Sequence, residues 1–123
     1  MVDDAPAVRE SLGWLLLDEP GLTVVGDAAD GSEAMRLALE LVPDLVILDI
    51  ELPDTDGFHV TRQLKALPRA PLVVLLSIHN DDLSRQRGAQ AGCDAFVEKG
   101  LGWSSLLAVL QKTLNDGRLD PQR

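Results

Sequence analysis

Hydrophobic residues along the chain gather in three short runs, at residues 22–25, 45–48 and 72–76, with a weaker run at residues 95–97. The three stronger runs are rich in Val, Leu and Ile, do not alternate with polar residues, and are bounded by Gly, Pro or Asp. Continuous apolar runs of this length are typical of strands that are covered on both faces. We therefore expect a sheet buried between helices.

Between these runs, apolar residues recur at the three- and four-residue spacing of amphipathic helices. Residues that favour helix starts and stops stand at the matching places. One helix is expected to begin at Pro6, a second after a cap at Asp30 or Ser32, and a third to end before Pro68. A fourth is expected to begin at Asp81, and the last to cover residues 104–114. Alternation of strand and helix through the whole chain predicts an α/β fold with a doubly wound parallel sheet, helices on both faces and right-handed crossovers.

The composition fits one small globular domain. The chain has 123 residues, of which 46% are hydrophobic and 25% charged. Lys and Arg number 11 against 20 Asp and Glu, a formal net charge of −9 that disfavours direct contact with nucleic-acid backbones. A single cysteine excludes an internal disulfide, and no apolar run has the length of a membrane span. We assign residues 1–115 to the domain and residues 116–123, which are polar, to the start of a linker or a C-terminal tail.

Polar residues follow the expected strands at the point where each strand ends. Asp3 and Asp4 follow the apolar stub at residues 1–2, Asp49 follows the run at 45–48, Ser77 the run at 72–76, and Lys99 the run at 95–97 with one residue between. Parallel strands bring their carboxyl ends to one edge of the sheet, where the sites of such folds lie. Three carboxylates, one hydroxyl and one ammonium are therefore expected to converge.

This set of groups has a chemical logic. Clustered carboxylates repel one another unless a hard cation offsets their charge, and oxygen ligands suit Mg²⁺. A carboxylate held in this way can attack a phosphoryl group and form an acyl phosphate, while a lysine offsets charge on the transferring oxygens. The sequence predicts a site that accepts a phosphoryl group.

Each of these residues also has a purely structural interpretation. Asp3 and Asp4 precede Pro6 and fit a helix cap, and Asp49 fits a turn at the end of a strand. Ser77 alone is typical of a turn, and Lys99 alone is typical of a solvated strand end. The joint placement of these residues at four strand ends favours the functional interpretation over the separate structural ones.

A second acidic motif, Asp-Thr-Asp-Gly at residues 54–57, resembles the opening of a calcium loop or of a haloacid-dehalogenase-type phosphatase. No acidic residue closes a calcium loop at residues 64–66, and Pro53 separates the motif from the preceding apolar run. We expect a turn instead, with Gly57 at positive φ and Asp56 capping the following helix.

The sequence resembles the receiver domain of two-component response regulators over nearly its whole length, from Val2 to about Leu114. The likeness rests on Val-Asp-Asp at residues 2–4, Leu-Val-Ile-Leu-Asp-Ile-Glu-Leu-Pro at 45–53, Asp-Gly at 56–57, Leu-Leu-Ser at 75–77, Ala-Gly at 91–92, Phe96 and Lys99. Residues 26–31 and 116–121 are most similar to the NarL/FixJ (LuxR-type) subfamily. The resemblance implies a flavodoxin-like (CheY-like) sheet with strand order 2-1-3-4-5.

The resemblance also implies a role for each site residue. Asp49 would be the phosphoacceptor, with Lys99 pairing with the phosphoryl group. Mg²⁺ would be held by the side chains of Asp4 and Asp49, by the backbone carbonyl of Glu51, and by Asp3 through a water molecule.

Two further residues would form the switch that responds to phosphorylation. Ser77 takes the place of the family's switch Ser or Thr, and Phe96 the place of its switch aromatic residue. Ser77 would move toward the phosphoryl oxygens and vacate space for Phe96. The polar helix between Asp81 and Gly92 would be the mobile element.

The resemblance implies a cytoplasmic, phosphorylation-dependent signalling switch that receives its phosphoryl group from a sensor histidine kinase and acts in transcription regulation. It implies no enzymatic activity apart from self-phosphorylation and autodephosphorylation. Homodimers would be a possible form, no membrane is involved, and DNA would be contacted only through a helix-turn-helix domain outside these residues. The alternatives are a receiver-like interaction module that is not phosphorylated and, more distantly, a Mg²⁺-dependent phosphatase.

The chain departs from the family pattern at its first strand, which is central in the 2-1-3-4-5 order but is represented only by Met1 and Val2. Three explanations stay open: the sequence starts late relative to the natural protein, a neighbouring chain fills the place, or the domain is impaired.

Overall fold

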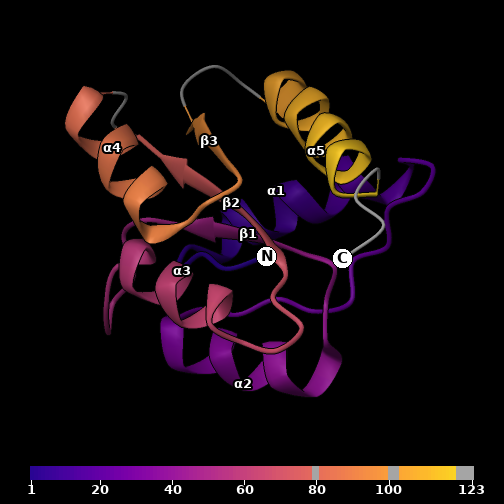
Figure 1. The fold of residues 1–123 in the computed structure, drawn as a ribbon. Coiled ribbons are helices and arrows are strands. Elements are labelled where there is room, and N and C mark those ends of the chain that lie inside the picture. The colour runs from indigo at the N-terminus through magenta and orange to yellow at the C-terminus, as the bar shows by residue number, and fades with distance from the viewer. Residues whose placement is uncertain (79–80, 100–102, 119–123) are drawn as a thin grey trace.

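The computed structural model describes residues 1–78, 81–99 and 103–118. Its centre is a parallel sheet of three strands, β1 (Leu45–Asp49), β2 (Leu72–Ser77) and β3 (Ala95–Glu98), in the order β1-β2-β3 (Figure 1). β2 is buried along its whole length, as expected of a strand with a neighbour on each side and helices on both faces. These three strands confirm the predictions made from the second, third and fourth apolar runs.

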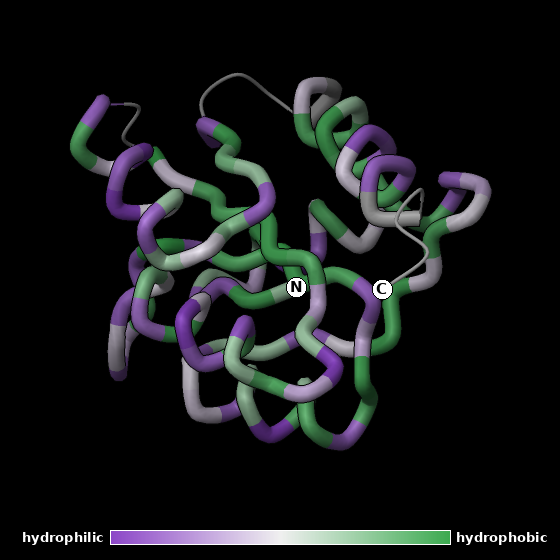
Figure 2. Tube along the Cα trace, in the orientation of Figure 1, coloured by the Kyte–Doolittle hydropathy of each residue, from purple (hydrophilic) through white to green (hydrophobic). Residues whose placement is uncertain are grey.

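Helices cover both faces of the sheet (Figure 1). The helices are α1 (Pro6–Leu17), α2 (Gly31–Leu41), α3 (Gly57–Lys65), α4 (Asp82–Ala91) and α5 (Trp103–Arg118). Successive strand side chains point to opposite faces, so the core has two halves. One half joins Leu48 and Val73 to α2, α3 and α4, and the other joins Ile47 and Val74 to α1 and α5. Figure 2 shows the hydrophobic colour concentrated along the sheet and alternating with hydrophilic colour along the helices.

The helix boundaries follow the local signals in the sequence. Pro6 opens α1, and the carboxylates of Asp30 and Asp81 accept hydrogen bonds from backbone N–H groups in the first turns of α2 and α4. Gly92 ends α4 in the left-handed conformation, with φ of 98°. No helix in the described part of the chain is long and apolar enough to cross a membrane.

The predicted end of the last helix at Leu114 is wrong, because α5 continues to Arg118. Gly and Asn at residues 115–117 are weak helix formers, but a single Gly lowers helix stability by only about 1 kcal/mol. The apolar face of α5, which buries Leu106 and Leu110, is enough to support the additional turn. Residues 119–123 of the predicted tail lie outside the described residues.

The predicted strand at residues 22–25 does not form. Only Ala28 of this part of the chain makes a β-bridge, to Val2, and Val24 and Val25 are 43% and 56% exposed. A strand needs a neighbour that pairs with its backbone, and the neighbour on this side is limited to the first two residues. Residues 22–25 thus have the composition of a strand but, among the described residues, no neighbouring strand with which their backbone could pair.

Val2 is the point at which the N-terminus enters the sheet. Its N–H donates to the carbonyl of Ile47 at 2.8 Å and its carbonyl accepts from the N–H of Asp49 at 2.9 Å. On its other side, Val2 pairs with Ala28, whose N–H donates to the carbonyl of Met1 at 2.9 Å. Val2 thus lies, as a bridge residue, in the position that the 2-1-3-4-5 order predicts for the first strand.

A cavity of about 450 Å³ lies beside Val2, between β1 and residues 21–28. Its apolar lining comes from both core halves and from the unformed strand, and includes Leu16, Leu22, Leu37, Ile47, Leu110 and Leu114. The N-terminal amine lies at this cavity and donates to the carbonyl of Gly26 at 3.3 Å. Burial lowers the pKa of this amine, against the opposing effect of the nearby Asp27 carboxylate.

A strand placed in this cavity should stabilise the domain. We predict that an N-terminal extension of four β-branched apolar residues raises the free energy of unfolding by roughly 2 kcal/mol, because burial of its side chains outweighs the ordering of its backbone. Urea denaturation would measure the change. An extension of equal length made of Gly and Ser is the control, and equal effects of the two extensions would contradict the prediction.

Candidate functional site: an acidic cluster at the carboxyl ends of the strands

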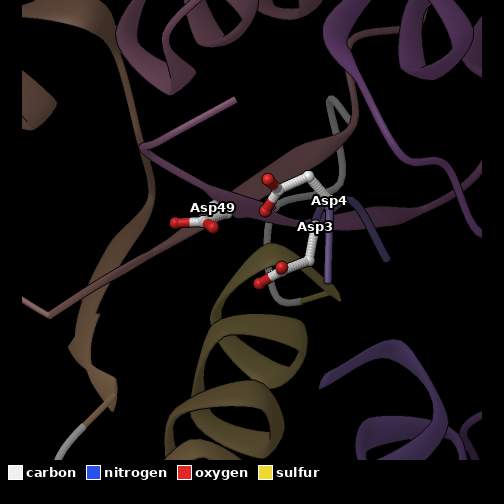
Figure 3. Close-up of side chains that lie close together, drawn as sticks. All are labelled: Asp3, Asp4 and Asp49. Atoms are coloured by element: carbon white, nitrogen blue, oxygen red, sulfur yellow. The ribbon is translucent and has the colours of Figure 1, made fainter. Parts of the chain in front are cut away.

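Three carboxylates converge at the edge of the sheet where the strands end (Figure 3). Asp49 is the last residue of β1, and Asp3 and Asp4 follow Val2, which pairs with Leu48 of the same strand. One carboxylate oxygen from each of Asp3, Asp4 and Asp49 lies within 4.8 Å of the other two. The predicted convergence of these acidic residues is thus present in the structure.

The three carboxylates have different environments. Asp3 is 2% exposed, and its Oδ1 accepts a hydrogen bond from the N–H of Ala5 at 2.9 Å. The guanidinium of Arg9 donates to the backbone carbonyl of Asp3 and so holds this turn from α1. Asp49 is buried as well, whereas Asp4 is exposed. The cluster therefore has a buried floor and one carboxylate directed toward solvent.

Lys99, which follows β3, supplies the positive charge of the cluster. Its Nζ lies 2.9 Å from Oδ2 of Asp3 and 3.0 Å from Oδ2 of Asp49. Burial disfavours the charged form of Lys99, but its hydrogen bonds to Asp3 and Asp49 prevail and raise its pKa above the ordinary value. Lys99 is therefore a cation at neutral pH that binds two carboxylates at once.

Asp49 itself has a raised pKa. The main cause is burial, which penalises the ionised carboxylate, and the nearby Asp3 adds to it. The hydrogen bond from Lys99 and that from the N–H of Glu51, at 3.2 Å to Oδ1, act in the opposite direction. In Asp49, therefore, the effect of burial on the pKa outweighs that of the two hydrogen bonds.

Ser77 and Phe96 lie on the neighbouring strands. Ser77 is the last residue of β2 and is 4% exposed. Phe96, on β3, is half-buried, and the Arg85 guanidinium of α4 lies 5.0 Å from the centre of its ring. The structure thus places the two predicted switch residues on adjacent strands, with α4 over the aromatic ring.

The loop after β1 folds back on the end of the strand. The N–H of Gly57 donates to the carbonyl of Ile50 at 2.7 Å, and Glu51 and Asp56 form an antiparallel bridge. The prediction of positive φ at Gly57 is wrong. Glycine is needed there because a Cβ would lie 2.6 Å from the carbonyl oxygen of Asp49 and 2.7 Å from Cα of Ile50.

The second acidic motif serves as a pair of helix caps. Asp56 accepts a hydrogen bond from the N–H of His59 at 2.8 Å and caps α3, as predicted. Asp54 accepts from the N–H groups of Gly31 and Ser32 at the start of α2. This second link was missed by the sequence analysis, because the two partners are more than twenty positions apart and carry no local signal.

The donor set of the cluster fits a divalent metal ion. Its ligand atoms are all carboxylate oxygens, which suit Mg²⁺. Three carboxylates face the single ammonium of Lys99, so the cluster keeps an excess of negative charge that a divalent cation would offset.

The comparisons agree on one family. Residues 1–111 match the response regulator receiver domain. The chain is 32% identical over 123 residues to the response regulator GacA of Pseudomonas aeruginosa, covering 99% of this chain and 58% of GacA. A solved two-component response regulator of the LuxR family from Aurantimonas sp. SI85-9A1 has a TM-score of 0.88 and 32% identity, covering 94% of this chain and 82% of that one.

The chain belongs to the response regulator receiver domain family, whose members are phosphorylation-dependent signalling switches. It is also 38% identical over 101 residues to a protein-glutamate methylesterase/protein-glutamine glutaminase of Methanospirillum hungatei, covering 80% of this chain and 29% of that protein. This match involves only the receiver part of the methylesterase. The chain spans 58% or less of the length of these two curated relatives.

Replacement of Asp49 should reveal the raised pKa as a pH dependence of stability. Between the ordinary pKa of 3.8 and the higher value in the folded state, the folded protein binds more protons than the unfolded chain, so the free energy of unfolding falls as pH rises. We predict that Asp49→Asn removes this fall and raises the free energy of unfolding at pH 7, because Asn carries no charge that burial penalises.

Urea denaturation over a pH series, with a chelator present, would test this prediction. The control is Asp44→Asn, which changes an exposed carboxylate that precedes the same strand. A slope of stability against pH that is the same for Asp49→Asn and the parent chain would contradict the assignment of a raised pKa to Asp49.

Proposed function

We propose that Asp49 accepts a phosphoryl group from a phosphohistidine of a sensor histidine kinase. In this step an Asp49 carboxylate oxygen attacks phosphorus, the bond from phosphorus to the imidazole nitrogen breaks, and the imidazole leaves with the electron pair. Water reverses the modification by attacking the phosphorus and releasing phosphate and the carboxylate. The observation that carries the proposal is the buried Asp49 carboxylate, which lies against Lys99 and has an oxygen within 4.8 Å of an oxygen of Asp3 and one of Asp4.

The chain offers a consistent set of groups for Mg²⁺. The side chains of Asp4 and Asp49 and the backbone carbonyl of Glu51 would hold the ion, and Asp3 would contribute through a water molecule. Asp4 is the exposed carboxylate of the three, which supports its direct contact with the ion. When bound, the ion would neutralise charge on the phosphoryl oxygens.

Lys99 would stabilise the modified state. In the structure its ammonium binds carboxylate oxygens of both Asp3 and Asp49. A phosphoryl group on Asp49 would present oxygens with more negative charge in the same place, so Lys99 would shift toward them without losing its electrostatic partner. The same residue thus supports the site before and after phosphorylation.

Ser77 and Phe96 would carry the signal away from Asp49. Ser77 would donate a hydrogen bond to a phosphoryl oxygen, and its movement would open space into which Phe96 turns. The contact between Phe96 and Arg85 supports this route, since any rotation of the ring changes a contact with α4. Apart from Leu83, the exposed residues of α4 are small or polar, which suits an element that changes position.

The output of the proposed switch is transcription regulation in the cytoplasm. The likeness to GacA and to a LuxR-family response regulator supports this assignment. DNA would be bound by a separate helix-turn-helix domain rather than by this acidic domain, and homodimerisation remains a prediction. The chain itself would catalyse only its own phosphorylation and dephosphorylation.

A second function, that of a receiver-like interaction module without phosphorylation, is favoured by one observation. The N-terminal segment pairs with β1 through the single bridge residue Val2, so the backbone pairing that precedes Asp3 and Asp4 is short. Phosphorylation of the protein would distinguish the two functions.

We predict that incubation with acetyl phosphate and Mg²⁺ adds one phosphoryl group to the chain, as measured by intact mass. Asp49→Asn and a sample with chelator should show no gain, because the nucleophile or the cation is missing. Lys99→Met should lower the yield, since it leaves the phosphoryl charge without its ammonium partner. A folded parent chain that gains no phosphoryl group would leave the interaction module as the function.

The switch should depend on the hydroxyl of Ser77. We predict that phosphorylation changes the hydrogen–deuterium exchange of α4, and that Ser77→Ala reduces this change at least twofold while Asp49 is still phosphorylated. The control is Ser11→Ala, an exposed position on α1. An undiminished response of α4 in Ser77→Ala would show that the signal follows another route.

A further inference from the structure

The first turn of α2 is capped twice, from two different parts of the chain. Oδ1 of Asp30, the residue that precedes the helix, accepts a hydrogen bond from the N–H of Glu33 at 2.8 Å. The carboxylate of Asp54, in the loop after β1, accepts from the N–H of Gly31 at 2.8 Å and from the N–H of Ser32 at 3.0 Å. A helix of this kind needs only its own cap to begin. The second cap therefore ties the loop to the helix.

The packing at this contact is close. A Cβ on Gly31 would lie 2.5 Å from Cγ2 of Thr55 and 2.9 Å from Cγ2 of Val60, so Gly31 is the residue that lets the loop approach the helix. The N–H groups of Gly31 and Ser32 hold the pKa of the Asp54 carboxyl below its ordinary value. Asp54 is therefore ionised at neutral pH and accepts two hydrogen bonds, although it is exposed to solvent.

The other end of the same loop belongs to the acidic cluster. Glu51 donates its N–H to Oδ1 of Asp49 at 3.2 Å and pairs with Asp56 across the loop. Gly57 closes the loop by its hydrogen bond to Ile50 at 2.7 Å. The loop is thus anchored to β1 at its base and to α2 through Asp54, with Glu51 between the two anchors.

We infer that Asp54 is a positioning residue that holds the loop of residues 50–57 in the conformation in which the backbone carbonyl of Glu51 can serve the metal site. This inference rests on the proposed function and deepens it. Asp54 contacts no reacting atom and acts through the loop. It also couples the start of α2 to the metal site, since movement of either one strains the same pair of hydrogen bonds.

The two caps of α2 provide a matched comparison. Asp54→Ala and Asp30→Ala each remove a side-chain cap from the same turn, so both should lower the urea midpoint. Only Asp54→Ala releases the loop. We expect it to weaken Mg²⁺ binding roughly tenfold, as measured by calorimetric titration with the metal alone, because groups that orient metal ligands have effects of this size. Asp30→Ala should bind Mg²⁺ like the parent chain.

Amide exchange provides a readout that does not depend on the metal. In Asp54→Ala, the amide of Gly57 should exchange faster than in the parent chain or in Asp30→Ala, because its hydrogen bond to Ile50 closes the released loop. Asp54→Asn, which keeps one acceptor oxygen, should give intermediate values of Mg²⁺ affinity and of Gly57 amide exchange. This variant replaces Asp54→Ala in the test if Asp54→Ala does not fold.

The outcomes separate the inference from the proposed function. Equal Mg²⁺ affinity and equal Gly57 exchange in Asp54→Ala and Asp30→Ala would overturn the inference and leave the proposed function intact. A parent chain that binds no Mg²⁺ would instead contradict the proposed function, and the exchange of Gly57 alone would then decide whether Asp54 holds the loop. Faster exchange confined to Asp54→Ala supports the inference.

Discussion

The interaction on which the rest of the site depends is the shared ammonium of Lys99. Two buried carboxylates from distant parts of the chain, Asp3 and Asp49, would repel each other strongly without a cation between them. Lys99 binds both at about 3 Å and so offsets their repulsion where Val2 holds the N-terminus against β1. The cluster keeps a net negative charge that a divalent cation would offset.

The position of these three groups follows from the parallel sheet. β1, β2 and β3 run in the same direction and lie side by side, so whatever follows each strand arrives at one edge. Residues that are far apart in the sequence therefore meet without any special local structure. The same geometry puts Ser77 at the end of β2 and Phe96 on the adjacent strand β3.

The sequence predicted most of this arrangement because its signals are local. An apolar run followed by Asp, Ser or Lys is visible in a few residues, and so are the caps at Asp30, Asp56 and Asp81. The strand at residues 22–25 was wrongly predicted because its formation depends on a neighbour rather than on its own side chains. The Asp54 link to α2 was not predicted because nothing near Asp54 indicates which helix it faces.

The single-residue entry of Val2 into the sheet has a consequence for the dynamics of the domain. The hydrogen bonds of Val2 and its neighbours hold the N-terminus, Ala28 and β1 together, and Asp3 and Asp4 follow directly. Fraying of the first residues would therefore open the sheet edge and disperse the acidic cluster in the same event. By thermodynamic linkage, any ion that binds only the assembled cluster must also suppress that fraying. Occupancy of the site and order at the N-terminus are two measures of one equilibrium.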